Sequence, residues 1–123
     1  CIDMAVLTAE AFSVEITFKN DIVCIAVIDD AYSGRISLNY QKQDFASFVS
    51  ELTELFQSLH KGTASLEEYY EPEENVIAFE SDGMGHFHVN GILNNWGNWT
   101  LKFSKTIDQS YFKNFIRQLQ SEI

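Results

Sequence analysis

Residues 12–28 have the sequence FSVEITFKNDIVCIAVI, in which apolar and polar side chains alternate from Phe12 to Phe18. A period of two is typical of a β-strand with one buried face. Asn20-Asp21 then favours a tight turn, and the almost entirely apolar residues 22–28 predict a strand inside a sheet. Residues 35–41 alternate again. This part of the chain therefore predicts three adjacent antiparallel strands joined by short turns.

Two helices are predicted by a different spacing of apolar side chains. The first is expected to begin at Asp44 as its cap and to stop at Gly62, and the second is expected to begin after Asp108. In both segments apolar residues recur every three or four positions and would form one buried face. These residues are Phe45, Phe48, Val49, Leu52, Leu55 and Phe56 in the first helix and Phe112, Phe115, Ile116, Leu119 and Ile123 in the second.

The segment between the helices is expected to contain a polar loop at residues 61–75 and strands at 76–80, 85–93 and 99–106. These elements predict an α+β fold of two layers, in which one antiparallel sheet of about six strands carries both helices on one face. Because each half of the chain has strands followed by a helix, the sequence also fits a βββα unit written twice. All of residues 1–123 are expected to form one domain.

The composition is acidic. Eighteen Asp and Glu residues against eight Lys and Arg residues give a net charge of −10 and a pI near 4.5. Such a protein repels the phosphates of nucleic acids and of anionic membranes, and it attracts basic proteins. We therefore expect neither nucleic acid nor a membrane as partner, and we expect a basic protein.

The two cysteines, Cys1 and Cys24, are not expected to form a disulfide. Cys24 lies in an apolar run and resembles a small buried hydrophobe, whereas Cys1 is at the start of the chain. Apolar runs are also far shorter than the ~18 residues of a membrane span. These features predict a protein of the reducing cytoplasm. Two alternatives stay open at the chain start: Cys1 could carry a lipid, or Met4 could be the natural first residue.

An acidic segment is the first candidate for function, because residues 62–101 contain many Asp and Glu residues but no Lys or Arg. Tyrosines among these acids, and a tryptophan in a later turn, would be suitable anchors for a protein partner. The alternative is an ordinary solvated loop. The candidate partner-binding residues are Glu67, Glu68, Tyr69, Tyr70, Glu71, Glu73, Glu74, Asp82 and Trp96.

His86 and His88 are the second candidate, because residues two apart on a strand project from the same face and can share a zinc ion. Glu80 or Asp82 could supply a further ligand. The alternative is a polar face in contact with water. The sequence contains no nucleophile motif and no phosphate-binding glycine loop, so we expect neither catalytic residues nor a cofactor.

Residues 98–112, NWTLKFSKTIDQSYF, combine a strand ending in Leu-x-Phe with an Asp-Gln-Ser-Tyr segment that opens a helix. This resembles the closing segment of WapI-type immunity proteins, which are small bacterial proteins encoded beside toxins of polymorphic or contact-dependent systems. The first helix at Asp44-Phe45, the Lys61-Gly62 stop and the strand at 85–93 follow the order of elements in that family.

The resemblance implies a binding protein, not an enzyme, that neutralises a cognate toxin, often a basic nuclease. The acidic composition agrees with such a partner. We expect the residues from Glu67 to Glu74, with Trp96, to cover the active surface of the toxin, and we expect a monomer or weak homodimer. Two alternatives remain: a metal-binding or enzymatic protein that uses His86 and His88, and an interaction domain that associates with itself.

Overall fold

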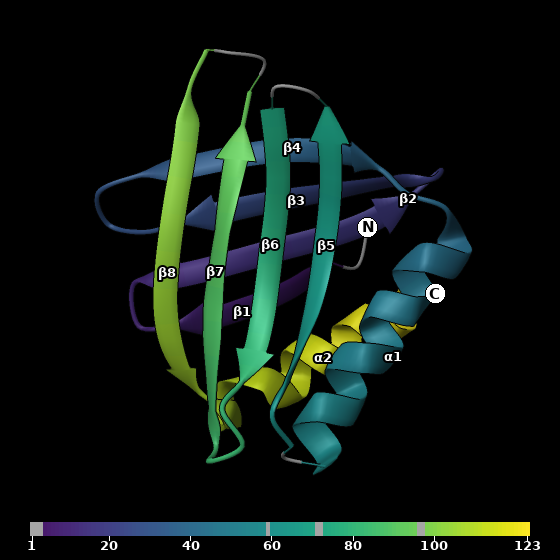
Figure 1. Cartoon of the computed structure of the whole chain (residues 1–123), viewed down its shortest axis with the longest axis vertical. Helices are drawn as coiled ribbons and strands as arrows, with labels where there is room; N and C mark the ends of the chain where they lie inside the picture. Colours follow the sequence, from purple (N-terminus) through teal and green to yellow (C-terminus); the bar gives the residue numbers. More distant parts are fainter. Residues whose placement is uncertain (1–3, 59, 71–72, 96–97) are drawn as a thin grey trace.

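The computed structural model describes residues 4–58, 60–70, 73–95 and 98–123 (Figure 1). In these residues, two antiparallel four-stranded sheets follow the orders β1-β2-β3-β4 and β5-β6-β7-β8. The first sheet consists of β1 (Ala5–Ala9), β2 (Phe12–Lys19), β3 (Ile22–Ile28) and β4 (Ser33–Asn39). The remaining elements are α1 (Lys42–Ser58), β5 (Gly62–Tyr70), β6 (Glu73–Ser81), β7 (His86–Asn94), β8 (Thr100–Asp108), the 3-10 turn η1 (Gln109–Tyr111) and α2 (Phe112–Ser121).

The two sheets face each other, and in Figure 1 the strands β5–β8 cross in front of the strands β1–β4. Inward-facing residues such as Ile16, Ile25, Phe79 and Val89 are fully buried between them. The α+β class is as predicted, but the single sheet of about six strands is wrong. An alternating strand shows that one of its faces is buried without showing whether a helix or a second sheet covers that face.

The strand β5 replaces the polar loop expected at residues 61–75. It pairs with β6 from Gly62↔Ser81 to Tyr70↔Glu73, and its Ala64 and Leu66 are fully buried. The other residues of β5 are mostly polar, and they hid this alternation in the sequence. The short strand β1 was also not expected. Within the described residues, each half of the chain therefore has four strands and an α-helix, one strand more than the predicted βββα unit.

The helices lie along one side of the sheets (Figure 1), where α1 packs against β5 and α2 against β1. The prediction that both helices share one face of a single sheet is therefore wrong. Their apolar stripes are largely confirmed. Phe48, Phe112 and Phe115 are buried around Phe79, and the buried Phe45 stacks on Phe18. The exception is Ile123, which is 45% exposed.

Several local predictions have mixed outcomes. Asn20 and Asp21 have positive φ values of 54° and 61°, as in a tight hairpin turn. The predicted cap of the first helix is wrong, because Asp44 lies inside the first turn of α1.

The Asp108 carboxylate accepts a hydrogen bond from the Ser110 N–H and caps η1, the 3-10 turn that leads into α2. Cys24 is half-buried on the outward face of β3, not in the core, with its Sγ 3.4 Å from the Ser37 hydroxyl.

Neither helix is long and apolar enough to cross a membrane, within the residues that the structure describes.

Candidate functional site

The acidic segment forms the hairpin of β5 and β6. Glu67, Glu68 and Tyr69 belong to β5, and Glu74 lies opposite Tyr69 on β6. The backbones of Tyr70 and Glu73 close the hairpin as the last pair. Glu71 lies outside the described residues. The structure thus brings the predicted residues of this hairpin together, but on paired strands and not in a loop.

The alternation of β5 divides these residues between two directions. Glu67 and Tyr69 project outward, and the Tyr69 hydroxyl donates a hydrogen bond to the Glu67 Oε2 (3.3 Å). Tyr69 is 58% exposed, and desolvation together with the nearby Glu67 and Glu74 carboxylates raises its pKa. Glu68 projects to the other side, where its carboxylate accepts a hydrogen bond from the Asn39 N–H (2.9 Å). Glu68 therefore helps to join the two sheets, whereas Glu67 and Tyr69 face solvent.

Tyr40 also contacts this hairpin, although the sequence contained no sign of the contact. Its hydroxyl accepts a hydrogen bond from the Glu67 N–H (2.8 Å) and lies 3.2 Å from the Glu67 carbonyl, to which it donates. Tyr40 follows β4 and is half-buried, and desolvation is the main reason why its pKa is raised. The neutral hydroxyl can therefore both donate and accept. No local pattern pointed to Tyr40, because its partner is distant in sequence.

Asparagine side chains hold the neighbouring strand ends next to this hairpin. The Asn94 N–H donates to the Asn75 Oδ1 (2.7 Å), and the Asn94 side-chain amide donates to the Glu74 carbonyl. The Thr100 hydroxyl donates to the Asn94 Oδ1 (2.6 Å). The connection between β7 and β8 therefore lies at the same end of the sheet as the acidic hairpin (Figure 1). Trp96 belongs to this connection but lies outside the described residues.

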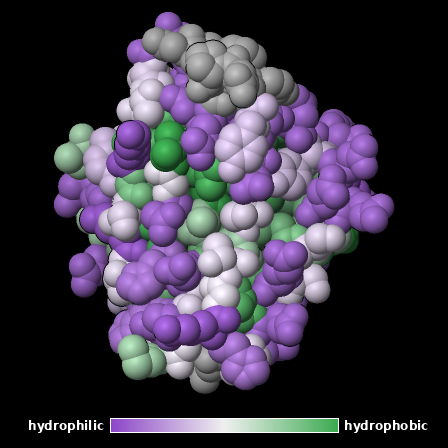
Figure 2. All heavy atoms as spheres, viewed as in Figure 1, coloured by the Kyte–Doolittle hydropathy of each residue, from purple (hydrophilic) through white to green (hydrophobic). Residues whose placement is uncertain are grey.

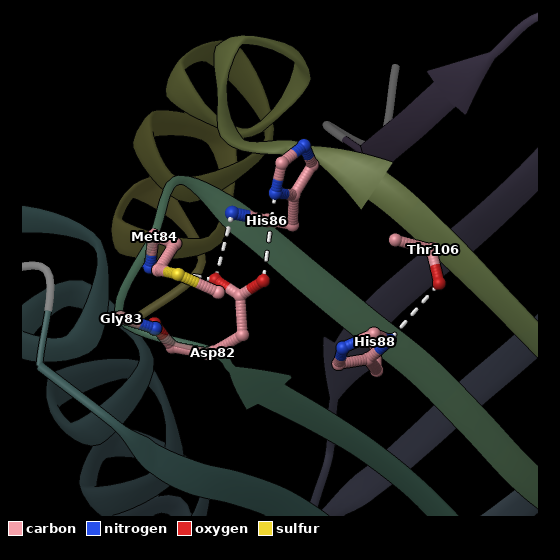
Figure 3. A network of polar contacts seen from close by, with 7 residues as sticks. Asp82, Gly83, Met84, His86, His88 and Thr106 are labelled. Atoms are coloured by element: carbon pink, nitrogen blue, oxygen red, sulfur yellow. Dashed lines mark hydrogen bonds and ion pairs between the residues drawn. The ribbon is translucent and has the colours of Figure 1, made fainter.

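Asp82 lies at the opposite end of the sheet, after β6 (Figure 1). With about 3.3 Å per strand residue, it is roughly 26 Å from Glu74. Its Oδ1 accepts hydrogen bonds from the N–H groups of Met84 (2.7 Å) and His86 (3.2 Å), as Figure 3 shows. The Met84 bond is the main cause that lowers the Asp82 pKa. The structure therefore separates Asp82 from the hairpin acids and places it in the turn between β6 and β7.

His86 and His88 lie on one face of β7, as predicted (Figure 3). The His86 Nδ1 is 3.4 Å from the Asp82 Oδ2, and the His88 Nδ1 is 2.9 Å from the Thr106 hydroxyl. Glu80 lies opposite His88 on β6. Across the described ranges, no group of three or more His, Cys, Asp or Glu residues is arranged to hold a metal ion. The metal alternative rests on the two histidines alone.

A family model described as the immunity protein WapI-like family matches residues 5–123. The chain belongs to the WapI-like immunity protein family. The match extends the resemblance of residues 98–112 to both sheets and both helices of this WapI-like protein. Neither the curated proteins nor the solved structures contain a match to it. Family membership indicates toxin immunity, so the exposed surfaces of this WapI-like protein are the places to look for its function.

Proposed function

We propose that this WapI-like protein binds a cognate bacterial toxin and neutralises it by covering the toxin's active surface, without catalysing a reaction itself. The observation that carries the proposal is the family match, which covers residues 5–123. Immunity by binding requires an exposed surface that complements the toxin, and the acidic hairpin of β5 and β6 is such a surface.

A basic toxin of the nuclease type agrees best with the charge. The chain carries a net charge of −10, and residues 62–101 contain no Lys or Arg. A nuclease binds phosphates with cationic side chains, so carboxylates such as those of Glu67 and Glu74 can occupy the same positions. Complementary charges would also speed the encounter of the two proteins. Occlusion of the phosphate-binding surface would then prevent the toxin from binding its substrate.

The test uses the toxin domain encoded by the reading frame next to this gene. We expect that cells producing this domain survive only when they also produce the WapI-like chain, and that the two purified proteins form a stoichiometric complex. A chain that neither protects the cells nor binds the domain would contradict the proposal. Protection without a complex would contradict occlusion.

A further inference from the structure

We propose that the outward face of the second sheet, formed by β5–β8, is the surface that receives the toxin, and that it fits a cationic partner surface with an apolar centre. This inference rests on the proposed function. It names a wider surface than the acidic hairpin, because it includes residues of all four strands. Figure 1 looks onto this face, and none of the described elements covers it.

The strand register arranges the outward side chains of this face in rows that cross the sheet. One row has an apolar middle, because Val76 lies opposite Ile92, with Glu67 at one end and Lys102 at the other. Val76 and Ile92 are only half-buried, because no described element packs on them. Figure 2 shows the apolar and neutral centre of this face surrounded by hydrophilic residues.

The next row contains only short side chains. Ser65, Ala78, Asn90 and Ser104 are paired in this order across β5, β6, β7 and β8. Side chains of this size project little from the sheet, so a partner's side chains can approach closely between the apolar row and the row of His88. Packing of this kind is typical of the core of a protein interface, which is surrounded by a polar rim.

The charges of the rim indicate which partner fits. Glu67, Glu74, Glu80 and Asp108 project from this face, and Lys102 is its single Lys or Arg among the described outward residues. The outward face of the first sheet differs. There Glu15 is paired with Arg35 (3.9 Å), and the face also carries Lys19 and the exposed residues Ile22 and Ile28.

The acidic excess thus lies on the second sheet, so a cationic toxin would prefer that side. The size of the face also suits a protein partner. Four strands of nine residues cover roughly 20 by 30 Å, or about 600 Å². Each partner buries about 800 Å² in a standard interface. The face therefore supplies most of the area that one partner buries in such an interface.

The experiment compares Ser104→Arg with Ser37→Arg. Both serines are exposed, and each lies in the middle of an edge strand on the outward face of its sheet, Ser104 on β8 and Ser37 on β4. The probe is the purified toxin domain from the adjacent reading frame. A new arginine facing a cationic partner adds both bulk and repulsion, so we expect Ser104→Arg to raise the Kd about 30-fold or more. Ser37→Arg should leave the Kd within about two-fold.

A second pair of variants guards against a simple folding defect. Lys102→Glu adds negative charge to the proposed face, and Lys19→Glu makes the same change on the first sheet. We expect Lys102→Glu to raise the association rate several-fold more than Lys19→Glu, a gain that misfolding cannot produce.

The possible outcomes distinguish a wrong choice of surface from a wrong function. Loss of binding with Ser37→Arg but not with Ser104→Arg would assign the toxin to the first sheet, and normal binding by both would place it elsewhere. Either result overturns the proposed face while leaving immunity intact. A wild-type chain that does not bind the toxin domain would overturn both proposals.

Discussion

At the scale of single residues, the Tyr40 hydroxyl forms backbone hydrogen bonds that a neighbouring strand would form inside a sheet. β5 is an edge strand, so the side of it away from β6 has backbone groups without a strand partner. The Tyr40 hydroxyl bonds both backbone groups of Glu67 on that side. This contact also sets the position of Glu67 and Tyr69 at the candidate interface.

We expect Tyr40→Phe to lower the free energy of unfolding by about 1–2 kcal/mol, because the Glu67 backbone loses both partners. Urea unfolding measures the change, and hydrogen exchange should become faster at the Glu67 amide. Tyr111→Phe is the control, since Tyr111 is 44% exposed and lies in η1. Equal stability of the wild type and Tyr40→Phe would show that the two hydrogen bonds of the Tyr40 hydroxyl contribute nothing to the free energy of unfolding.

Asp82 allows a prediction about pH. The Met84 N–H hydrogen bond is the largest cause that holds the Asp82 pKa below its usual 3.8. A carboxyl whose pKa is lower in the folded state stabilises the fold above its unfolded pKa, and this contribution disappears as the pH falls through the folded pKa.

Asp82→Asn should therefore lower the Tm at pH 7, and the difference from wild type should shrink as the pH falls from about 4 to 2. Thermal unfolding across this range tests the sign, with the exposed Asp30→Asn as control. A difference that grows on acidification would refute the role of the charged carboxylate.

At the scale of elements, the second sheet depends on a close approach at Gly91 in β7. A Cβ atom at this position would lie 2.2 Å from the Val76 carbonyl oxygen and 2.9 Å from the Phe103 ring. The backbone of β6 cannot move away without disturbing its pairing with β5 and β7. Gly34 in β4 is less restrictive, because the atoms nearest to a Cβ there belong to the side chains of Trp99 and Leu101, at 3.0 Å.

We expect Gly91→Ala to reduce the free energy of unfolding by about 2 kcal/mol or more. Gly34→Ala should cost less, since side chains can shift where a paired backbone cannot. Denaturant unfolding of both variants makes the comparison. A larger loss for Gly34→Ala would mean that side-chain packing between the sheets, not strand pairing, limits this part of the fold.

At the scale of the whole molecule, the net charge of −10 is distributed unevenly over two exposed sheet faces. Net charge affects the approach to any cationic partner, whereas the placement of the charges determines the orientation in which the partner binds. The two contributions can be distinguished by moving the same charge change to different places on the molecule.

Glu67→Lys with Glu74→Lys, on the candidate interface, should slow association with the toxin domain about ten-fold at low salt, and the effect should shrink at high salt. Glu51→Lys with Glu54→Lys changes the net charge equally on exposed positions of α1. Equal slowing by both pairs would show that net charge alone is responsible and that the hairpin is not the contact surface.

Local patterns in the sequence were enough to predict six of the strands, β2, β3, β4, β6, β7 and β8, and the buried faces of both helices. Periodicity reflects which side of an element avoids water. Phe12 to Phe18 and Phe45 to Phe56 are examples. The acidic composition and the resemblance of residues 98–112 to WapI-type immunity proteins also came from the sequence, and the latter agrees with the family match over residues 5–123.

The partners of those elements depended on contacts between distant residues. Nothing near Val14 or Phe79 shows that their strands cover each other, so one sheet was expected where two exist. The segment around Ala64 and Leu66 is a strand, despite its polar residues, because it pairs with β6 and buries these two side chains in the core. The contact of Tyr40 with Glu67 likewise joins residues that are distant in sequence. Asp82 lies far from Glu74 because the extended strand β6 separates them. Side-chain period is a local property, whereas the surface that covers an apolar face is chosen by the folded chain as a whole.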